Sequence, residues 1–186
     1  MEGVAIVESL LDFEAAGQLI LASENETLPG AVTVALGAAR RNPGGVAAFL
    51  ESAIVEGPYP SVVVGDLTGW SNALRTAPAK LLARLAHAVQ PGGSLFAGFG
   101  NRHYPGGPFA AGTLSLKRAC AVLDRVGFTV AKQYVAMPDQ RCPALLVPVS
   151  ASEAELACVP PALRFQFAPA YAVVGLRPSA EPYAER

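Results

Sequence analysis

The sequence predicts a three-layer α/β/α sandwich whose sheet is mostly parallel and has an antiparallel C-terminal part. Short apolar runs rich in β-branched residues are too continuously apolar for a sheet with one solvated face, which is typical of buried parallel strands. Segments of helical length and periodicity separate these runs. The predicted parallel strands cover residues 4–7, 31–36, 46–50, 61–64 and 94–99.

The clearest predicted helix covers residues 78–90. Leu81, Leu85 and Val89 recur on one face, Pro78 suits the first helical position, and Gly92 follows the end. Three further helices are predicted: residues 13–22, a helix from Ser115 or Thr113 to Gly127, and a short helix at 153–159. The C-terminal strands are predicted at 129–137 and 170–176, with an edge piece at 143–148.

Composition indicates one domain over residues 1–178, followed by a tail at 179–186. The 186 residues are 52% hydrophobic and 16% charged, and 14 Lys+Arg against 15 Asp+Glu give a net charge of -1. Nucleic-acid binding through a broad basic face is therefore disfavoured, and disorder over most of the length is excluded. The three cysteines and two histidines have no metal-ligand spacing, so no metal is expected. Neither a signal peptide nor a membrane span is predicted, which favours a cytoplasmic protein with no membrane partner.

Polar and small residues follow the predicted strands, where ligands bind in open α/β sheets. Because the carboxyl ends of parallel strands meet at one edge of a sheet, these residues are candidates for one pocket. The candidates are Glu8, Ser9, Gly37, Glu51, Ser52, residues 66–70 and residues 100–104.

The second half of the chain resembles the class I S-adenosylmethionine-dependent methyltransferases. The resemblance rests on the order of four motifs over about residues 60–176. These are Ser61-Val62-Val63-Val64-Gly65-Asp66-Leu67, Pro91-Gly92-Gly93-Ser94-Leu95-Phe96, Gly127-Phe128-Thr129-Val130, and Met137-Pro138-Asp139 followed by Ala144-Leu145-Leu146-Val147-Pro148. It implies a Rossmann-like fold, S-adenosylmethionine as the cofactor, and Glu8, Ser9, Gly37, Glu51 and Asp66 as cofactor-binding positions.

The first half departs from the family's pattern, which normally has a glycine-rich loop after its first strand. No glycine pair stands in residues 4–17, where Leu10, Leu11 and Phe13 place bulky side chains. Gly37 stands where the family has an acid that accepts hydrogen bonds from the ribose hydroxyls. We therefore expect a degenerate or shortened cofactor half in which Glu51 is the candidate acceptor for the adenine amino group.

Asp66 is the leading candidate residue, because an ionised carboxylate at the end of an apolar strand needs hydrogen bonds or solvent. It is interpreted as a polar anchor or proton acceptor, or as the cap of the turn at residues 66–69. Trp70 in the same loop is interpreted as a wall of a substrate pocket, or as ordinary core.

Residues 101–104 form the densest polar cluster beside the predicted crevice. His103 is a candidate general base, and Arg102 a candidate partner for a carboxylate or phosphate. Asn101 and Tyr104 complete the candidate substrate site. The alternative is a solvated loop without chemistry, and residues 105–108 are a candidate lid or hinge.

Three functional hypotheses follow. The first is a methyltransferase-like enzyme acting on a small-molecule metabolite, with Asp66 or His103 as base. The second is a degenerate member that catalyses a non-methylating reaction such as a cyclisation on a hydrophobic metabolite. The third is a pseudoenzyme that binds a partner subunit. A homodimer is compatible with all three.

Overall fold

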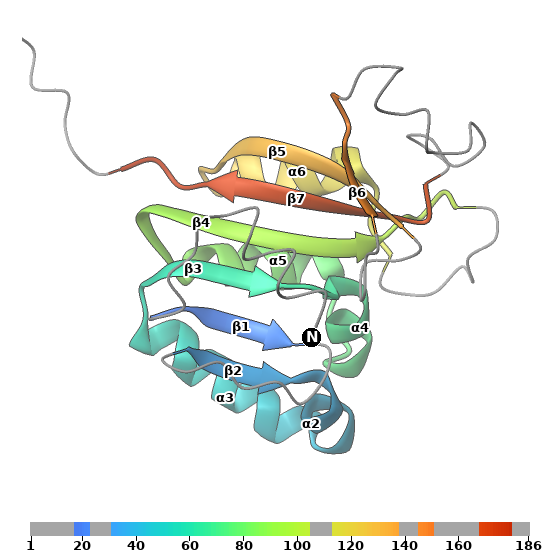
Figure 1. Cartoon of the computed structure of the whole chain (residues 1–186). Coiled ribbons are helices and arrows are strands. Elements are labelled where there is room, and N and C mark those ends of the chain that lie inside the picture. The colour runs from blue at the N-terminus through green and yellow to red at the C-terminus, as the bar shows by residue number, and fades with distance from the viewer. Residues whose placement is uncertain (1–16, 23–30, 105–112, 138–144, 151–167, 180–186) are drawn as a thin grey trace, which may run out of the picture.

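The computed structural model describes residues 17–22, 31–104, 113–137, 145–150 and 168–179. One sheet of seven strands runs in the order β2-β1-β3-β4-β7-β5-β6 (Figure 1). The strands are β1 (Leu19–Ala22), β2 (Val32–Ala35), β3 (Tyr59–Val64), β4 (Val89–Gly100), β5 (Thr129–Met137), β6 (Leu145–Pro148) and β7 (Ala170–Leu176). The helices are α2 (Leu36–Arg41), α3 (Pro43–Glu56), α4 (Leu67–Ala73), α5 (Pro78–His87) and α6 (Leu116–Arg125).

The sheet is parallel in one half and antiparallel in the other. Strands β2, β1, β3 and β4 run parallel to their neighbours, with Val62 of β3 opposite Leu95 of β4. Strand β7 lies between β4 and β5 and runs antiparallel to both, and β6 pairs antiparallel with β5. The predicted Rossmann-like α/β fold with an antiparallel C-terminal part is therefore confirmed.

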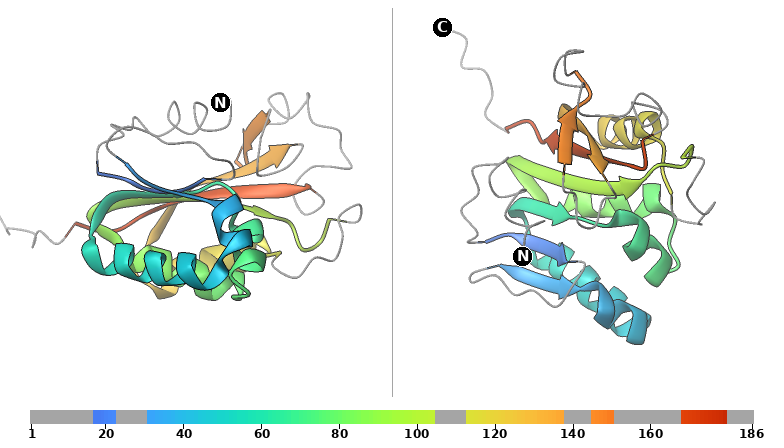
Figure 2. Two further views of the ribbon diagram at one scale, coloured as in Figure 1. Left: turned by 90° about the horizontal axis from the view of Figure 1, so that it is seen from below. Right: turned by 45° about the vertical axis from the view of Figure 1, so that its right-hand side comes forward.

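Helices α3, α5 and α6 cover one face of the sheet (Figure 2, left). The main core lies between these helices and the sheet and includes Leu82, Leu95 and Trp70, none of which is exposed. The other face carries a smaller buried cluster that includes Ile20 and Phe96. No helix of the described residues lies on that second face, so the described chain shows two of the three expected layers.

The sequence signals of the two best-defined helices match their structure. Helix α5 begins at Pro78 and buries Leu81, Leu82 and Leu85, but it ends at His87 rather than at residue 90. Helix α6 begins after Ser115, whose Oγ accepts a hydrogen bond of 3.3 Å from Arg118 N. No helix within the described ranges is long and apolar enough to cross a membrane.

The expected strand at residues 46–50 is wrong, because this segment lies within helix α3. Asn42 caps the helix by accepting a hydrogen bond of 3.0 Å from Gly45 N, and Pro43 occupies the first position. An Asn cap followed by Pro is a helix-start signal that outweighs the apolarity of residues 46–50. The chain thus passes from β2 through α2 and α3 directly to β3.

The expected helix at residues 13–22 is also corrected, because Leu19–Ala22 forms strand β1. All four residues are buried, with Leu19 and Leu21 in the main core and Ile20 in the smaller one. A short strand buried on both faces has no alternation that would distinguish it from a helix. The predicted elements at 4–7 and 153–159 and most of the predicted tail lie outside the described residues.

Candidate functional site

The carboxyl ends of β1, β2, β3 and β4 meet at one edge of the sheet (Figure 1). From β1 the chain continues to β2 on one side, whereas from β3 it continues to β4 on the other. The strand order therefore reverses between β1 and β3. In open α/β sheets this switch point is where ligands bind. The described residues that follow β3 at this point are Gly65 and Asp66.

Asp66 is fully buried and caps helix α4. Its Oδ1 accepts a hydrogen bond of 2.9 Å from Gly69 N, and its own carbonyl accepts one of 3.0 Å from Trp70 N. A Cβ on Gly69 would overlap the Asp66 carboxylate and come within 2.9 Å of Leu36 Cδ2. The capping carboxylate of Asp66 therefore fits only because residue 69 is a glycine. The structure assigns Asp66 the capping role that the turn interpretation described.

Replacing Asp66 tests the strength of this cap. Asp66→Ala removes the acceptor and leaves Gly69 N buried, so we expect a loss of about 1 to 3 kcal/mol in the free energy of unfolding. Asp66→Asn retains an acceptor oxygen and is expected to lose less. Urea unfolding of the two variants measures the difference. Equal losses would show that the hydrogen bond to Gly69 does not set the stability of this turn.

Gly65 is half-buried, and the described residues leave open space beside it. No described atom lies within 4 Å of the position that a Cβ on Gly65 would take. A glycine at a switch point lets a ligand approach the main chain closely. Sequence reasoning named Asp66 and passed over Gly65, although a glycine between an apolar strand and a strand-end acid was the available signal.

Thr68 links the start of α4 to the end of β4. Its Oγ1 accepts a hydrogen bond of 2.9 Å from Gly100 N, which fixes the neighbouring loop. Trp70, on the same helix, is 0% exposed and lies in the main core. Its Nε1 is buried and has no hydrogen-bond partner among the described residues. Trp70 is therefore a core residue rather than part of a pocket wall.

Asn101 connects three segments of the chain at the end of β4. Its Nδ2 donates to Ala168 O at 2.7 Å and to Tyr171 Oη at 3.4 Å, and its Oδ1 accepts from His103 N at 3.0 Å. Its main-chain N also donates to Pro169 O at 3.0 Å. The side chain is buried and engaged with protein groups. Asn101 is thus a positioning residue for the turn at 101–104, not a free amide for a substrate.

The turn that Asn101 holds presents polar groups to solvent. Arg102 and His103 are exposed, and Tyr104 is half-buried, with its main-chain N donating to Asn101 O at 3.3 Å. Tyr171, which meets the Asn101 amide from β7, has a pKa raised by burial. Its hydroxyl therefore stays protonated near neutral pH. The candidate lid at 105–108 lies outside the described residues.

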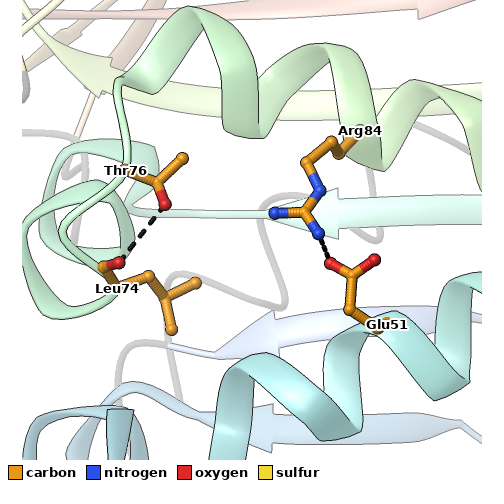
Figure 3. A network of polar contacts seen from close by, with 4 residues as sticks. All are labelled: Glu51, Leu74, Thr76 and Arg84. Atoms are coloured by element: carbon orange, nitrogen blue, oxygen red, sulfur yellow. Dashed lines mark hydrogen bonds and ion pairs between the residues drawn. The ribbon is translucent and has the colours of Figure 1, made fainter. Parts of the chain in front are cut away.

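Of the other described candidates, Glu51 lies away from this edge, whereas Gly37 follows the carboxyl end of β2. Glu51 lies in the middle of α3, where its carboxylate pairs with Arg84 of α5 in the helical layer (Figure 3). The same figure shows the hydrogen bond from Thr76 Oγ1 to Leu74 O. The strand that was expected to carry Glu51 to the pocket is a helix. Gly37 is the second residue of α2. Glu8 and Ser9 lie outside the described part of the chain.

The loop expected after a first strand at residues 4–7 lies outside the described residues. Leu10, Leu11 and Phe13 precede β1, so they are not the residues that follow it. The segment between β1 and β2 is residues 23–31, which contains a single glycine, Gly30. This connection is shorter than the dozen or more residues that a helical crossover between parallel strands usually takes. No group of three or more metal-ligating side chains occurs in the described ranges.

Comparison with known proteins gives similar structures but no similar sequences. No family model and no curated protein matches this chain. An O-methyltransferase family protein from Burkholderia thailandensis has a similar structure, with a TM-score of 0.51 and 16% identity over 96% of this chain and 56% of its own. The 4+2 cyclase SpnF follows at 0.48, with 13% identity over 95% and 80% of the two chains. Magnesium protoporphyrin IX methyltransferase (ChlM) from Synechocystis PCC 6803, with bound SAH, gives 0.47, with 13% identity over 94% and 80%.

The chain has a methyltransferase-like fold. This conclusion rests on the Burkholderia structure together with the strand order described above. The chain spans only 56% of that protein's length. Because the identity is only 16%, the similarity is limited to the fold.

The cofactor that a methyltransferase-like fold implies is S-adenosylmethionine, and two positions test whether the residues suit it. At the end of β3, no described atom fills the space beside the main chain of Gly65. At the end of β2, no acid is present: Ala35 is the last residue, and Leu36, 3% exposed, begins α2 at once. The described residues thus suit close approach of a ligand at β3, but they lack the ribose contact that the resemblance implies at β2.

Proposed function

We propose that this protein is a methyltransferase-like enzyme that binds S-adenosylmethionine at the switch point between β1 and β3 and acts on a small-molecule metabolite. The observation that carries the proposal is the space that the described residues leave open beside Gly65, at the position where an α/β sheet of this topology binds its ligand. When bound, the cofactor supplies an electrophilic methyl group on its sulfonium centre. The chain itself supplies binding, orientation and a proton acceptor.

Each residue at the edge has a proposed part. Gly65 leaves room for the ligand, and Asp66 acts through the main chain by holding the first turn of α4. Asn101 holds the turn that carries Arg102 and His103 into solvent beside the ends of β3 and β4. We assign to Arg102 the binding of an anionic substrate group and to His103 the acceptance of a proton from the substrate nucleophile. Tyr104 borders the same substrate.

Calorimetric titration with S-adenosylhomocysteine tests the proposal, using Gly65→Val and Gly44→Val as a matched pair. No described atom lies within 4 Å of the Cβ position of either glycine, but Gly44 lies in the first turn of α3 rather than at the end of β3. We expect the wild type and Gly44→Val to bind alike. Gly65→Val should bind about tenfold or more weakly, because its side chain would occupy the ligand's space. Absence of heat with the wild type at millimolar ligand would overturn cofactor binding.

A second candidate function is supported by the end of β2 and by the short β1–β2 connection. No acid follows Ala35, and only residues 23–31 connect β1 to β2. We therefore propose, as the alternative, a protein that binds a metabolite without transferring a methyl group. Such a protein is a non-methylating catalyst or a partner-binding pseudoenzyme. Thermal unfolding with a panel of hydrophobic metabolites tests it. The alternative requires a compound that stabilises the wild type but not Gly65→Val, together with no response to S-adenosylhomocysteine.

A further inference from the structure

Helix α3 exposes an apolar outer face. Most helices at the surface of a domain are polar on the solvent side, and only Leu50 and Ala53 of α3 are buried. Phe49 is 47% exposed and Val55 is 83% exposed. The exposed residues recur at intervals of three and four, so they share one side of the helix. This outer face of α3 consists of Gly45, Ala48, Phe49, Ser52, Val55 and Glu56.

The outer face lies at the margin of the molecule. Helix α3 lies beside α2 and below the edge strand β2 (Figure 1), and α5 is the neighbour on its other side, where Glu51 meets Arg84. The apolar residues are therefore not turned toward the helical layer. A run that is apolar on both its inner and its outer side resembles a buried strand, which explains why residues 46–50 are predicted as one.

We propose that a second copy of this chain covers the outer face of α3, giving a two-fold symmetric dimer with the two α3 helices antiparallel. The face carries both bulky and small exposed side chains. Ala48 and Ser52 are small, exposed residues beside Phe49, and the bulky Phe49 of the other copy packs against them. In an isologous interface every contact forms twice, once from each copy. Phe49 therefore contributes two anchoring side chains to the dimer, one from each copy.

The charges at the two ends of the helix also match in this orientation. Arg40 and Arg41 end α2 immediately before α3 begins, and Glu56 ends α3; all three are exposed. An antiparallel pairing places the cationic start of one helix beside the acidic end of the other, so Arg41 faces the partner's Glu56. A parallel pairing would place like charges together. The net charge of -1 adds little repulsion between copies.

Sedimentation velocity from micromolar to submillimolar concentration tests the dimer. The wild type should sediment as a dimer at the upper end, and Phe49→Glu should raise the dissociation constant by at least about tenfold. Leu176→Glu is the matched control, because Leu176 is 45% exposed but lies on β7. It should leave the dissociation constant unchanged. A wild type that stays monomeric throughout, or equal effects of the two substitutions, would overturn the proposal.

Charge reversal tests the antiparallel orientation and does not depend on Phe49→Glu remaining folded. Arg41→Glu and Glu56→Arg should each raise the dissociation constant by about two- to fivefold, and the double variant should restore it. Two single effects that add up in the double variant would rule out the antiparallel pairing. Neither substitution touches the switch point at Gly65, so binding of S-adenosylhomocysteine should be the same in all four proteins.

Discussion

Gly93→Ala is expected to lower the free energy of unfolding by about 3 kcal/mol, one of the two largest effects that we predict. A Cβ on Gly93 would lie 2.6 Å from Pro60 O, 2.8 Å from Val89 Cγ1 and 2.9 Å from Gln90 O. Two of these atoms belong to the main chain and cannot rotate away. The overlap must therefore be relieved by displacing β4 or β3 in the centre of the sheet.

The adjacent glycine provides the control, because Gly92 is special for a different reason. Gly92 has a φ of 78°, but the nearest atom to its Cβ position is Ser179 Cβ, at 3.8 Å. Gly92→Ala therefore creates no overlap and should cost only about 1 kcal/mol, from the left-handed backbone. Thermal or urea unfolding of both variants measures the two costs. If the two variants lost equal free energies of unfolding, close packing of Gly93 against β3 would not be the reason for a glycine at that position.

The second large effect is expected for Asn101→Ala, at about 2 to 4 kcal/mol. The substitution leaves Ala168 O and His103 N without the partners that the Asn101 side chain gives them, at a buried position. It also frees the turn that carries Arg102 and His103 from the start of β7. Urea unfolding should therefore show a much larger loss than for the neighbouring Arg102→Ala.

Arg102→Ala removes an exposed side chain and should change the stability by less than about 0.5 kcal/mol. If both variants unfold alike, the Asn101 amide does not join the segments as described. If Asn101→Ala is unstable but the ligand-bound protein regains its stability, the ligand itself contacts this turn.

The elements that could be predicted are those with signals in neighbouring residues. Helix α5 begins at Pro78, and α6 begins after the cap Ser115, because a fixed φ and a side-chain acceptor act within one turn. Strand β1 was missed because its four residues are buried on both faces. The same apolarity hid α3, whose capping residue Asn42 was the stronger signal.

The candidate site could be predicted in position but not in role. The sequence placed Asp66 at the end of a strand, and the strand order of the structure puts Gly65 and Asp66 at the switch point. The capping of Gly69 by Asp66 is a local pattern, and the turn interpretation described it correctly. The role of Asn101 depends on Ala168, which is 67 residues away in sequence, so no local pattern reveals it. Trp70 likewise became a core residue only through the packing of α4 against the sheet.

The position of β7 also constrains how the chain can assemble during synthesis. Strand β7 forms the seam between β4, in the parallel half, and β5, in the antiparallel half. Until residues 170–176 leave the ribosome, the nascent chain carries two open strand edges that would otherwise be in the middle of the sheet. Such edges pair readily with other chains. Truncation ahead of Ala170 should therefore produce aggregation-prone fragments.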